Sequence, residues 1–296
     1  MRVSGLLFYT VIIVIVISLV FIWFLPSIQD FMAGNTMWNG ISGFSHELQA
    51  ENVDSLAGLT QAPENSVLVS IPYLPYKEEE LTAIKGFVDN GGTLLLMDDF
   101  GYGNSLLTYL GKDARFSNKL LLDPLYSYKN PSLPRITDFT PKIEGVDEVT
   151  LNYATTLNNV ADQDVIAWSS SYSVLDLDEN FSPDESEPRG PFPVAAKLTA
   201  GKGTIAIVAD PSLMINSMVG RDDNYAFINY LSGGRDDSRK IIIDRSHLSQ
   251  TPLDISKTRL ANTREWLSNP YALVGITALV IVVVSRNTIR KGVTFG

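Results

Sequence analysis

The hydrophobic positions of this chain concentrate at its two ends. The runs Val3 to Leu25 and Trp266 to Ser285 contain no charged side chain, and a polar body separates them. A bilayer core about 30 Å thick needs roughly 20 apolar residues at about 1.5 Å of rise per helical residue, so each run is long enough to cross it. We therefore expect transmembrane helices within residues 1–26 and 266–285, the second followed by a short cytoplasmic tail, 286–296.

The basic residues beside the spans predict which side of the membrane the body occupies. Arg2 precedes the first span, and no Lys or Arg follows it until Lys77, which favours a cytoplasmic amino terminus. Two spans return the chain to the same side, so the body, 27–245, and a juxtamembrane linker, 246–265, are predicted to be extracytoplasmic. A cleaved signal peptide is the alternative, but the residues after Leu25 offer no small-x-small cleavage site.

Within the body, the clearest pattern is a strand, a helix and a second strand. Residues 66–71 form a short β-branched run that Pro72 closes, as in a buried strand. Residues 77–88 place apolar side chains at helical spacing, and Asn90-Gly91-Gly92 ends that helix before a second apolar run, 93–97. A βαβ unit of this kind implies parallel strands in an open sheet.

Similar segments recur further along the chain. We predict strands at 148–153, 164–168 and 240–244, a β-hairpin of 194–198 with 201–208, and helices at 222–231 and near 44–56. Residues 176–193 are predicted to form a loop rich in Pro, Asp and Glu. Together these elements predict an α/β body, a mostly parallel sheet flanked by helices, between two transmembrane helices.

Charge and composition exclude several classes of function. The body between the spans carries 19 basic and 33 acidic side chains, a net charge of −14, and such a surface repels nucleic acid. This acidity suits either simple solubility or an acidic docking face. The chain has no cysteine, which excludes disulfides, thiolate nucleophiles and Cys-ligated metals, and its two histidines are too few for a His-rich metal site. We expect no resident cofactor.

Side-chain oxygens gather in three loops that follow apolar strands. The first loop holds Asp98, Asp99 and Asn104, the second Asp210, Asn216, Asp223 and Asn224, and the third Asp244 and His247. Open α/β sheets bind ligands in the crevice beyond the carboxyl ends of their strands, so the three loops are expected to converge. We predict that the residues of the first two loops bind a ligand through hydrogen bonds.

A structural role is the alternative for each of these residues. Asp99 and Asp210 stand where a turn into a helix uses a side-chain oxygen as its N-cap, and Asn216 and Asn224 suit turns and caps. The gathering of all of them at strand ends favours a ligand.

Catalysis finds weaker support in the sequence. Asp244 and His247 are spaced to orient one another, but neither a G-x-S-x-G turn nor a cysteine version of it supplies a nucleophile. The spacing Asp176-x-Asp178-x-Asn180 with Glu187 is that of a calcium loop, yet Phe181 stands where the sharp turn needs glycine. The sequence therefore predicts no metal site and assigns no catalytic residue.

Two sets of motifs carry a family resemblance. The segment from Tyr76 to Asp99, with Gly91-Gly92 before its strand and Asp98-Asp99 after it, resembles a domain of unknown function found in prokaryotic membrane proteins with a class I glutamine amidotransferase-like fold. The second half of that family is similar to Gly190-Pro191-Phe192-Pro193, Gly201-Lys202-Gly203 and Asp210-Pro211-Ser212, followed by Asn216 and Asp223-Asn224. The resemblance covers most of residues 40–245.

The resemblance implies a flavodoxin-like sheet that lacks the amidotransferase triad. Members are often encoded beside MoxR-type ATPases, and the fold is similar to that of the auxiliary component of gliding-associated ABC transporters. We therefore expect a membrane-anchored, non-catalytic binding or assembly module for an envelope protein, peptide or glycan, with the lipid bilayer and other membrane proteins as partners. An envelope hydrolase using Asp and His247, and an accessory subunit of an ABC-type transporter, are the alternatives.

Overall fold

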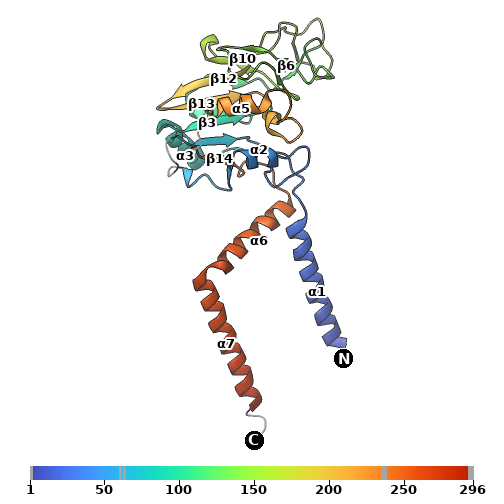
Figure 1. The fold of residues 1–296 in the computed structure, drawn as a ribbon, viewed down its shortest axis with the longest axis vertical. Helices are drawn as coiled ribbons and strands as arrows, with labels where there is room; N and C mark the ends of the chain where they lie inside the picture. The colour runs from blue at the N-terminus through green and yellow to red at the C-terminus, as the bar shows by residue number, and fades with distance from the viewer. Residues whose placement is uncertain (1–2, 60–61, 63–64, 235–238, 293–296) are drawn as a thin grey trace. The chain divides into compact units, whose positions relative to one another are not determined.

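The computed structural model describes residues 3–59, 62, 65–234 and 239–292. The chain forms two compact units, a body of Pro26–Ser249 and a helical unit that joins the residues up to Leu25 with those from Gln250 onward. The positions of the two units relative to one another are not determined (Figure 1).

The helical unit contains α1 (Val3–Phe24), α6 (Pro252–Ser268) and α7 (Pro270–Gly292). Much of the predicted linker, 246–265, is helical, because Thr251 and Asp254 form a capping box that starts α6. The extended backbone of Asn269 separates α6 from α7, so the second apolar run is divided between two helices.

One helical segment in the described part of the chain, Leu7–Phe24, is long and apolar enough to cross a membrane. Its place near the amino terminus fits a membrane anchor and a signal sequence equally well. The predicted second span stays a prediction, because several α7 side chains and the residues from 293 onward lie outside the described residues.

The body is built around one large sheet (Figure 1). Its strands are β1 (Glu51–Val53), β2 (Val67–Ser70), β3 (Thr93–Met97), β7 (Asp138–Phe139), β10 (Val165–Trp168), β12 (Pro193–Ala200), β13 (Gly203–Val208) and β14 (Ile241–Asp244). Among the described residues their order is β1-β14-β2-β3-β13-β12-β10-β7. The pairings from β1 to β13 are parallel and those from β13 to β7 antiparallel, which confirms the predicted α/β body with a mostly parallel sheet.

Short ribbons and helices complete the body. The ribbons pair β4 (Arg115–Phe116) with β9 (Leu157–Asn158), β5 (Leu120–Leu122) with β11 (Val174–Asp176), and β6 (Arg135–Ile136) with β8 (Val149–Thr150). The α-helices are α2 (Ser42–Glu47), α3 (Glu78–Asp89), α4 (Asn104–Tyr109) and α5 (Asn224–Leu231), and the 3₁₀ helices η2 (Asp162–Asp164) and η3 (Pro211–Met214).

Two sequence predictions about these elements were wrong in extent. The helix expected near 44–56 ends at Glu47, because Gln49 adopts a positive φ of 48°, and β1 follows it. The strand expected at 148–153 shortens to β8, which pairs with β6 outside the large sheet. The predicted unit of β2, α3 and β3 is confirmed, with Gly91 at a φ of 110° ending α3.

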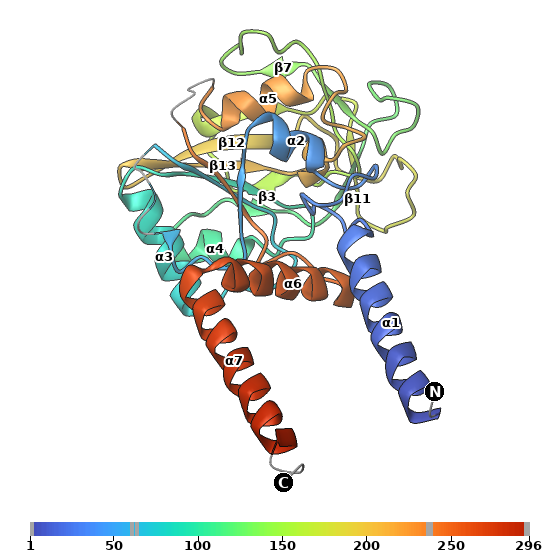
Figure 2. The ribbon, with the colours of Figure 1, turned by 60° about the horizontal axis from the view of Figure 1, so that its bottom comes forward.

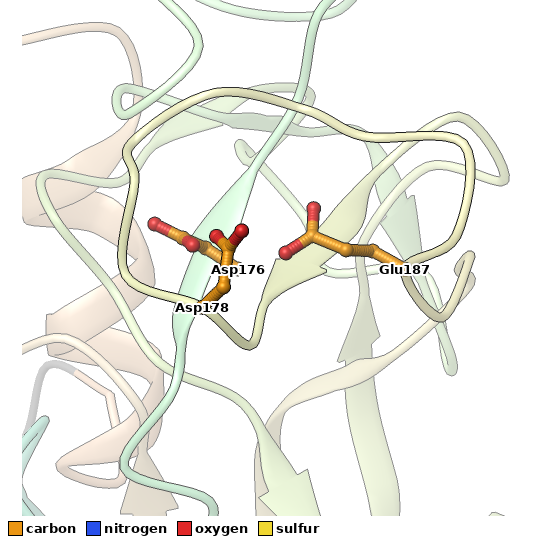
Figure 3. Close-up of side chains that lie close together, drawn as sticks. All are labelled: Asp176, Asp178 and Glu187. Carbon is orange, nitrogen blue, oxygen red and sulfur yellow. The ribbon is translucent and has the colours of Figure 1, made fainter.

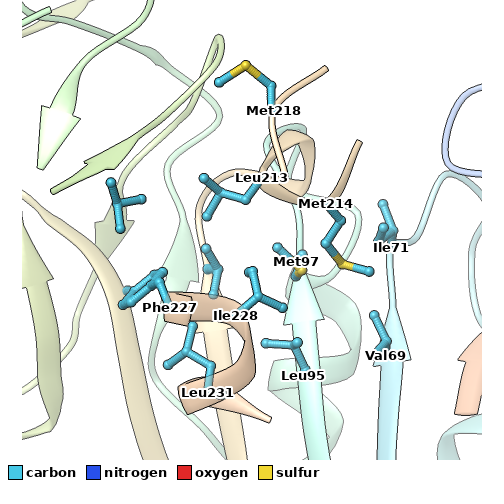
Figure 4. Close-up of a cluster of buried hydrophobic side chains, with 14 of the residues drawn as sticks. Val69, Ile71, Leu95, Met97, Leu213, Met214, Met218, Phe227, Ile228 and Leu231 are labelled. Atoms are coloured by element: carbon cyan, nitrogen blue, oxygen red, sulfur yellow. The ribbon is translucent and has the colours of Figure 1, made fainter. Parts of the chain in front are cut away.

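Alternate side chains of the central strands enter two cores. Val69, Leu95 and Met97 pack with the α5 residues Phe227 and Ile228 (Figure 4). The intervening strand residues pack with α3 and α4, so α2 and α5 cover one face and α3 and α4 the other (Figure 2). Because both faces are covered, the carboxyl-end edge of the strands is the part of the sheet left to hold a site.

Candidate functional site

The carboxyl ends of β3 and β13 bring three predicted carboxylates together. The two strands are parallel neighbours with Val208 opposite Met97, so Asp98 and Asp99 leave one strand beside Asp210 at the end of the other. Burial, followed by the charge of Asp98, raises the pKa of Asp99 to about 7. The first two of the predicted loops therefore come together at these three residues.

Asp98 shapes the loop that follows β3. One of its oxygens, Oδ1, accepts hydrogen bonds from the backbone N–H groups of Phe100 (2.8 Å) and Gly101 (3.1 Å), and Oδ2 accepts one from Gly103 (2.5 Å). Gly101 has a φ of 84°, which lets the loop turn sharply. The loop exposes Phe100, whose ring lies 5.7 Å from that of Tyr73. Burial raises the pKa of Asp98 although these hydrogen bonds oppose it.

Asp210, in the segment that follows β13, likewise binds backbone N–H groups. It is fully buried, and its oxygens accept hydrogen bonds from the N–H groups of Ser212 (2.7 Å) and Asn152 (2.6 Å). Burial raises the pKa of this carboxyl well above its usual value. The bond to Asn152 fixes the position of the next residue, Tyr153, whose φ is 55° and whose side chain is 53% exposed.

Asp99 lines a groove of about 400 Å³ beside these strand ends, which we call the strand-end groove. Its lining residues are Asp99, Phe100, Asn118, Lys119, Leu120, Tyr153, Ala154, Thr155, Glu179 and Phe181. Oδ1 of Asp99 is buried and accepts no hydrogen bond from any residue that the structure describes. Lys119 and Glu179, in the same groove, form an ion pair with 3.0 Å between Nζ and Oε1.

An acidic loop carries one wall of the groove. The carboxylates of Asp176, Asp178 and Glu187 lie within 4.8 Å of one another (Figure 3). Oδ2 of Asp176 accepts a 2.9 Å hydrogen bond from the N–H of Phe181, and Glu187 accepts N–H donors through both of its oxygens. These backbone hydrogen bonds brace the loop that carries Phe181.

Asn104 and Asn216 lie outside the groove lining and hold backbone segments in place. Asn104 accepts a hydrogen bond from the N–H of Phe116 (2.8 Å) and donates one to its carbonyl (3.1 Å). Asn216 accepts from the N–H of Gly43 (2.9 Å) and donates to the carbonyl of Met37 (2.6 Å). Both side chains use their donors and acceptors within the fold.

Asp223 and Asn224 also bind backbone. Oδ2 of Asp223 accepts hydrogen bonds from the N–H groups of Asp147 (2.8 Å) and Glu148 (3.1 Å). Asn224 is fully buried, accepts from the N–H of Thr150 (2.9 Å) and donates to its carbonyl (3.0 Å). These residues attach the start of α5 to β8, and neither lines the groove.

His247 is buried between two carboxylates. Its Nδ1 lies 2.6 Å from Oδ2 of Asp244, and its Nε2 lies 3.3 Å from Oε2 of Glu80. Burial lowers the pKa of His247, but the hydrogen bond and charge of Asp244 outweigh it and raise the pKa overall. Ser70 and Ser246 both donate their hydroxyls to Asp244, so neither is set as a nucleophile toward Nε2. His247 itself is only 2% exposed.

Several groove residues escaped the sequence analysis. Tyr153, Phe181 and Lys119 belong to irregular segments between short strands, and no local motif marks them as neighbours of Asp99. The nearest signal was the acidic spacing around Asp176, in which Phe181 figured only as the residue that argues against a calcium loop.

Comparison with known proteins gives one family and some distant structural similarities. The family model described as "Domain of unknown function (DUF4350)" matches residues 33–231. Among solved structures, the chain is similar to the "mmIFT52 N-terminal domain" at 14% identity and a TM-score of 0.48, covering 66% of this chain and 92% of that one. It is also similar to a β-galactosidase from Bacillus circulans sp. alkalophilus at 13% identity and a TM-score of 0.34, covering 57% of this chain and 23% of the enzyme. No curated protein matches.

Proposed function

We propose, from the premise that this chain belongs to the DUF4350 family, that it is a membrane-anchored, non-catalytic binding or assembly module. Its ligand is an envelope protein, peptide or glycan, held in the strand-end groove. The observation that carries this proposal is that Asp99 lines the groove while its buried Oδ1 has no hydrogen-bond donor among the described residues.

The neighbouring carboxylates make that observation informative. Asp98 and Asp210 use both of their oxygens to accept backbone N–H groups, whereas Oδ1 of Asp99 accepts none from the described residues. Leaving a buried acceptor unsatisfied costs about 1–3 kcal/mol. We propose that the Asp99 side chain turns on ligand binding, so that a ligand hydroxyl or amide in the groove supplies the donor that this buried oxygen lacks.

We propose anchoring by α1 and a second span within α7, with the body outside the cytoplasm. The apolar segment Leu7–Phe24 supports the first anchor, and the absence of Lys and Arg from its end to Lys77 supports the orientation. A protease added to intact cells is expected to digest the body. Digestion only in inverted vesicles would reverse the orientation.

Fold type and partners are proposed from the resemblance. We propose that the body has a flavodoxin-like, amidotransferase-like sheet that lacks the cysteine nucleophile. We propose that the protein acts with a MoxR-type ATPase or, as the alternative, with an ABC-type transporter. Co-purification of the tagged full-length chain from membranes, with mass identification of the ATPase or permease, distinguishes these partners.

The surroundings of His247 do not favour the hydrolase alternative. The imidazole is enclosed by Asp244, Glu80 and the ring of Tyr76, which lies 4.1 Å away between centroids. A general base must reach the proton it removes, and this imidazole is almost entirely shielded. We interpret the cluster as a structural brace at the carboxyl end of β14.

Photo-crosslinking in native membranes tests the binding module. We would replace Phe181 with p-benzoyl-L-phenylalanine in the full-length chain, and use the same replacement of Trp38 as the control. These side chains are similarly exposed, at 63% and 64%, but only Phe181 lines the groove.

We expect a discrete adduct with an envelope component at position 181 and none at position 38. The yield at position 181 should fall several-fold when Asp99→Asn is added, because the carboxyl group supports the ligand. Equal adduct yields at both positions would contradict binding in the groove. So would a yield at position 181 that Asp99→Asn leaves unchanged.

A further inference from the structure

We propose that the strand-end groove binds a neutral sugar ring of an envelope glycan, stacked on the aromatic side chains of its walls and hydrogen-bonded to Asp99 through sugar hydroxyls. This inference rests on the proposed function and names the ligand class of the same groove. It follows from three features of the lining residues: their aromatic content, the backbone that holds them and their charge.

Aromatic side chains from separate segments surround the groove. Phe100 follows β3, Tyr153 lies between β8 and β9, and Phe181 lies in the loop after β11. Their side chains are 51%, 53% and 63% exposed, although aromatic rings gain most from burial. The C–H bonds on one face of a pyranose ring form an apolar patch of matching size, and stacking would cover these rings. A groove of about 400 Å³ falls within the usual range of ligand sites, roughly 300–1,000 Å³.

Two of these aromatic residues occupy an unfavourable backbone conformation. Tyr153 and Phe181 have φ values of 55° and 61°, in the left-handed region that large side chains rarely adopt. The fold enforces both positions through buried carboxylates, since Asp210 binds the N–H of Asn152 and Asp176 binds that of Phe181. Such strain is typical of ligand clamps, because a relaxed backbone would place the rings elsewhere.

The charges of the groove favour a neutral ligand. Lys119 and Glu179 neutralise one another as an ion pair, and burial keeps Asp99 partly protonated near neutral pH. A cationic peptide or a polyanion therefore gains little Coulomb energy here, despite the acidity of the whole body. A sugar hydroxyl both donates and accepts, so it suits Asp99 in either protonation state. Asn118 adds an amide to the same lining.

Saturation-transfer NMR on the full-length protein in lipid nanodiscs tests the ligand class. The probes are three neutral disaccharides, cellobiose, maltose and N,N′-diacetylchitobiose, with digalacturonate and trilysine as charged comparisons and empty nanodiscs as background. Phe181→Asn removes the ring while keeping a residue that tolerates positive φ, so the loop can retain its shape. Phe181→Tyr keeps the ring, and Trp38→Ala removes an exposed ring that does not line the groove.

We expect saturation transfer to the ring C–H protons of at least one neutral disaccharide. Its affinity should fall about tenfold in Phe181→Asn, and stay within about twofold of wild type in Phe181→Tyr and Trp38→Ala. Absence of transfer from all three neutral sugars, binding that survives Phe181→Asn, or preference for digalacturonate or trilysine would overturn the inference. A specific protein or peptide adduct at position 181, without sugar binding, would overturn the glycan inference but leave the proposed binding module intact. If neither an adduct nor sugar binding is observed, both the glycan inference and the binding module are rejected.

Discussion

Oδ2 of Asp210 accepts a 2.6 Å hydrogen bond from the backbone N–H of Asn152, 58 residues earlier in the chain. This bond joins the carboxyl end of a central strand to the segment that carries Tyr153 into the groove. Asp98 acts similarly on the loop that carries Phe100. Two of the three clustered carboxylates therefore shape the groove, and Asp99 is the one that we propose meets a ligand.

Removing the Asp210 carboxylate should destabilise the body. We expect Asp210→Ala to lower the free energy of unfolding by about 2–3 kcal/mol, because it leaves the N–H groups of Asn152 and Ser212 without their acceptor. Urea unfolding of the full-length protein in detergent, followed by tryptophan fluorescence, measures the change. The exposed Asp113 provides a control, since Asp113→Ala should change stability by less than about 0.5 kcal/mol. Equal effects of the two substitutions would contradict this role of Asp210.

Replacing Asp99 should stabilise the protein in a pH-dependent way. Its pKa of about 7 exceeds the ordinary value of 3.8 for an aspartate, so between these pH values the folded state holds a proton that the unfolded state has lost. The contribution of Asp99 to wild-type stability is therefore expected to fall as pH rises from 4 to 7. Asp99→Asn cannot ionise and should gain about 1–2 kcal/mol at pH 8, after allowance for partial solvation, but little at pH 4. A gain of the same size at both pH values would argue against a desolvated carboxyl group.

The His247 brace also predicts a contribution to stability that falls as pH rises. The raised pKa of His247 means that its ionised form stabilises the fold, fully below the unfolded pKa near 6.5 and less as pH rises through the folded pKa. We expect His247→Gln to cost about 3 kcal/mol at pH 6, because the buried Asp244 loses its charged partner. The loss should shrink by pH 9. Unfolding curves at both pH values measure it, and a loss that grows with pH would be inconsistent with an imidazolium.

Asn216 should matter for stability but not for ligand capture. Its side chain ties Met37 and Gly43 to the segment after η3 through backbone hydrogen bonds. We expect Asn216→Ala to lower the unfolding free energy by about 1–3 kcal/mol, while the crosslinking yield at position 181 stays near wild type in folded protein. Loss of the adduct without loss of stability would place Asn216 in the ligand site instead.

Local sequence determined the elements that depend on neighbouring residues. The β-branched run before Pro72 and the helical spacing that ends at Gly91 gave β2 and α3 almost to the residue, since propensity, capping and turn chemistry act over a few positions. The apolar run of α1 is likewise visible from composition alone. The same reasoning placed Asp98, Asp99 and Asp210 at strand ends.

Tertiary structure decided which of those oxygens remain available and what surrounds them. Strand order placed β13 beside β3, and long-range hydrogen bonds assigned Asn216, Asp223 and Asn224 to backbone segments up to 181 residues away in sequence. Asp98 and Asn104 bind backbone groups of nearby residues instead. Asp210, which is remote in sequence, holds the backbone beside Tyr153. Asp176, at the start of the loop, holds the backbone of Phe181. Local patterns cannot specify these contacts, because burial of a polar group and its choice of partner are set by the packing of the whole body.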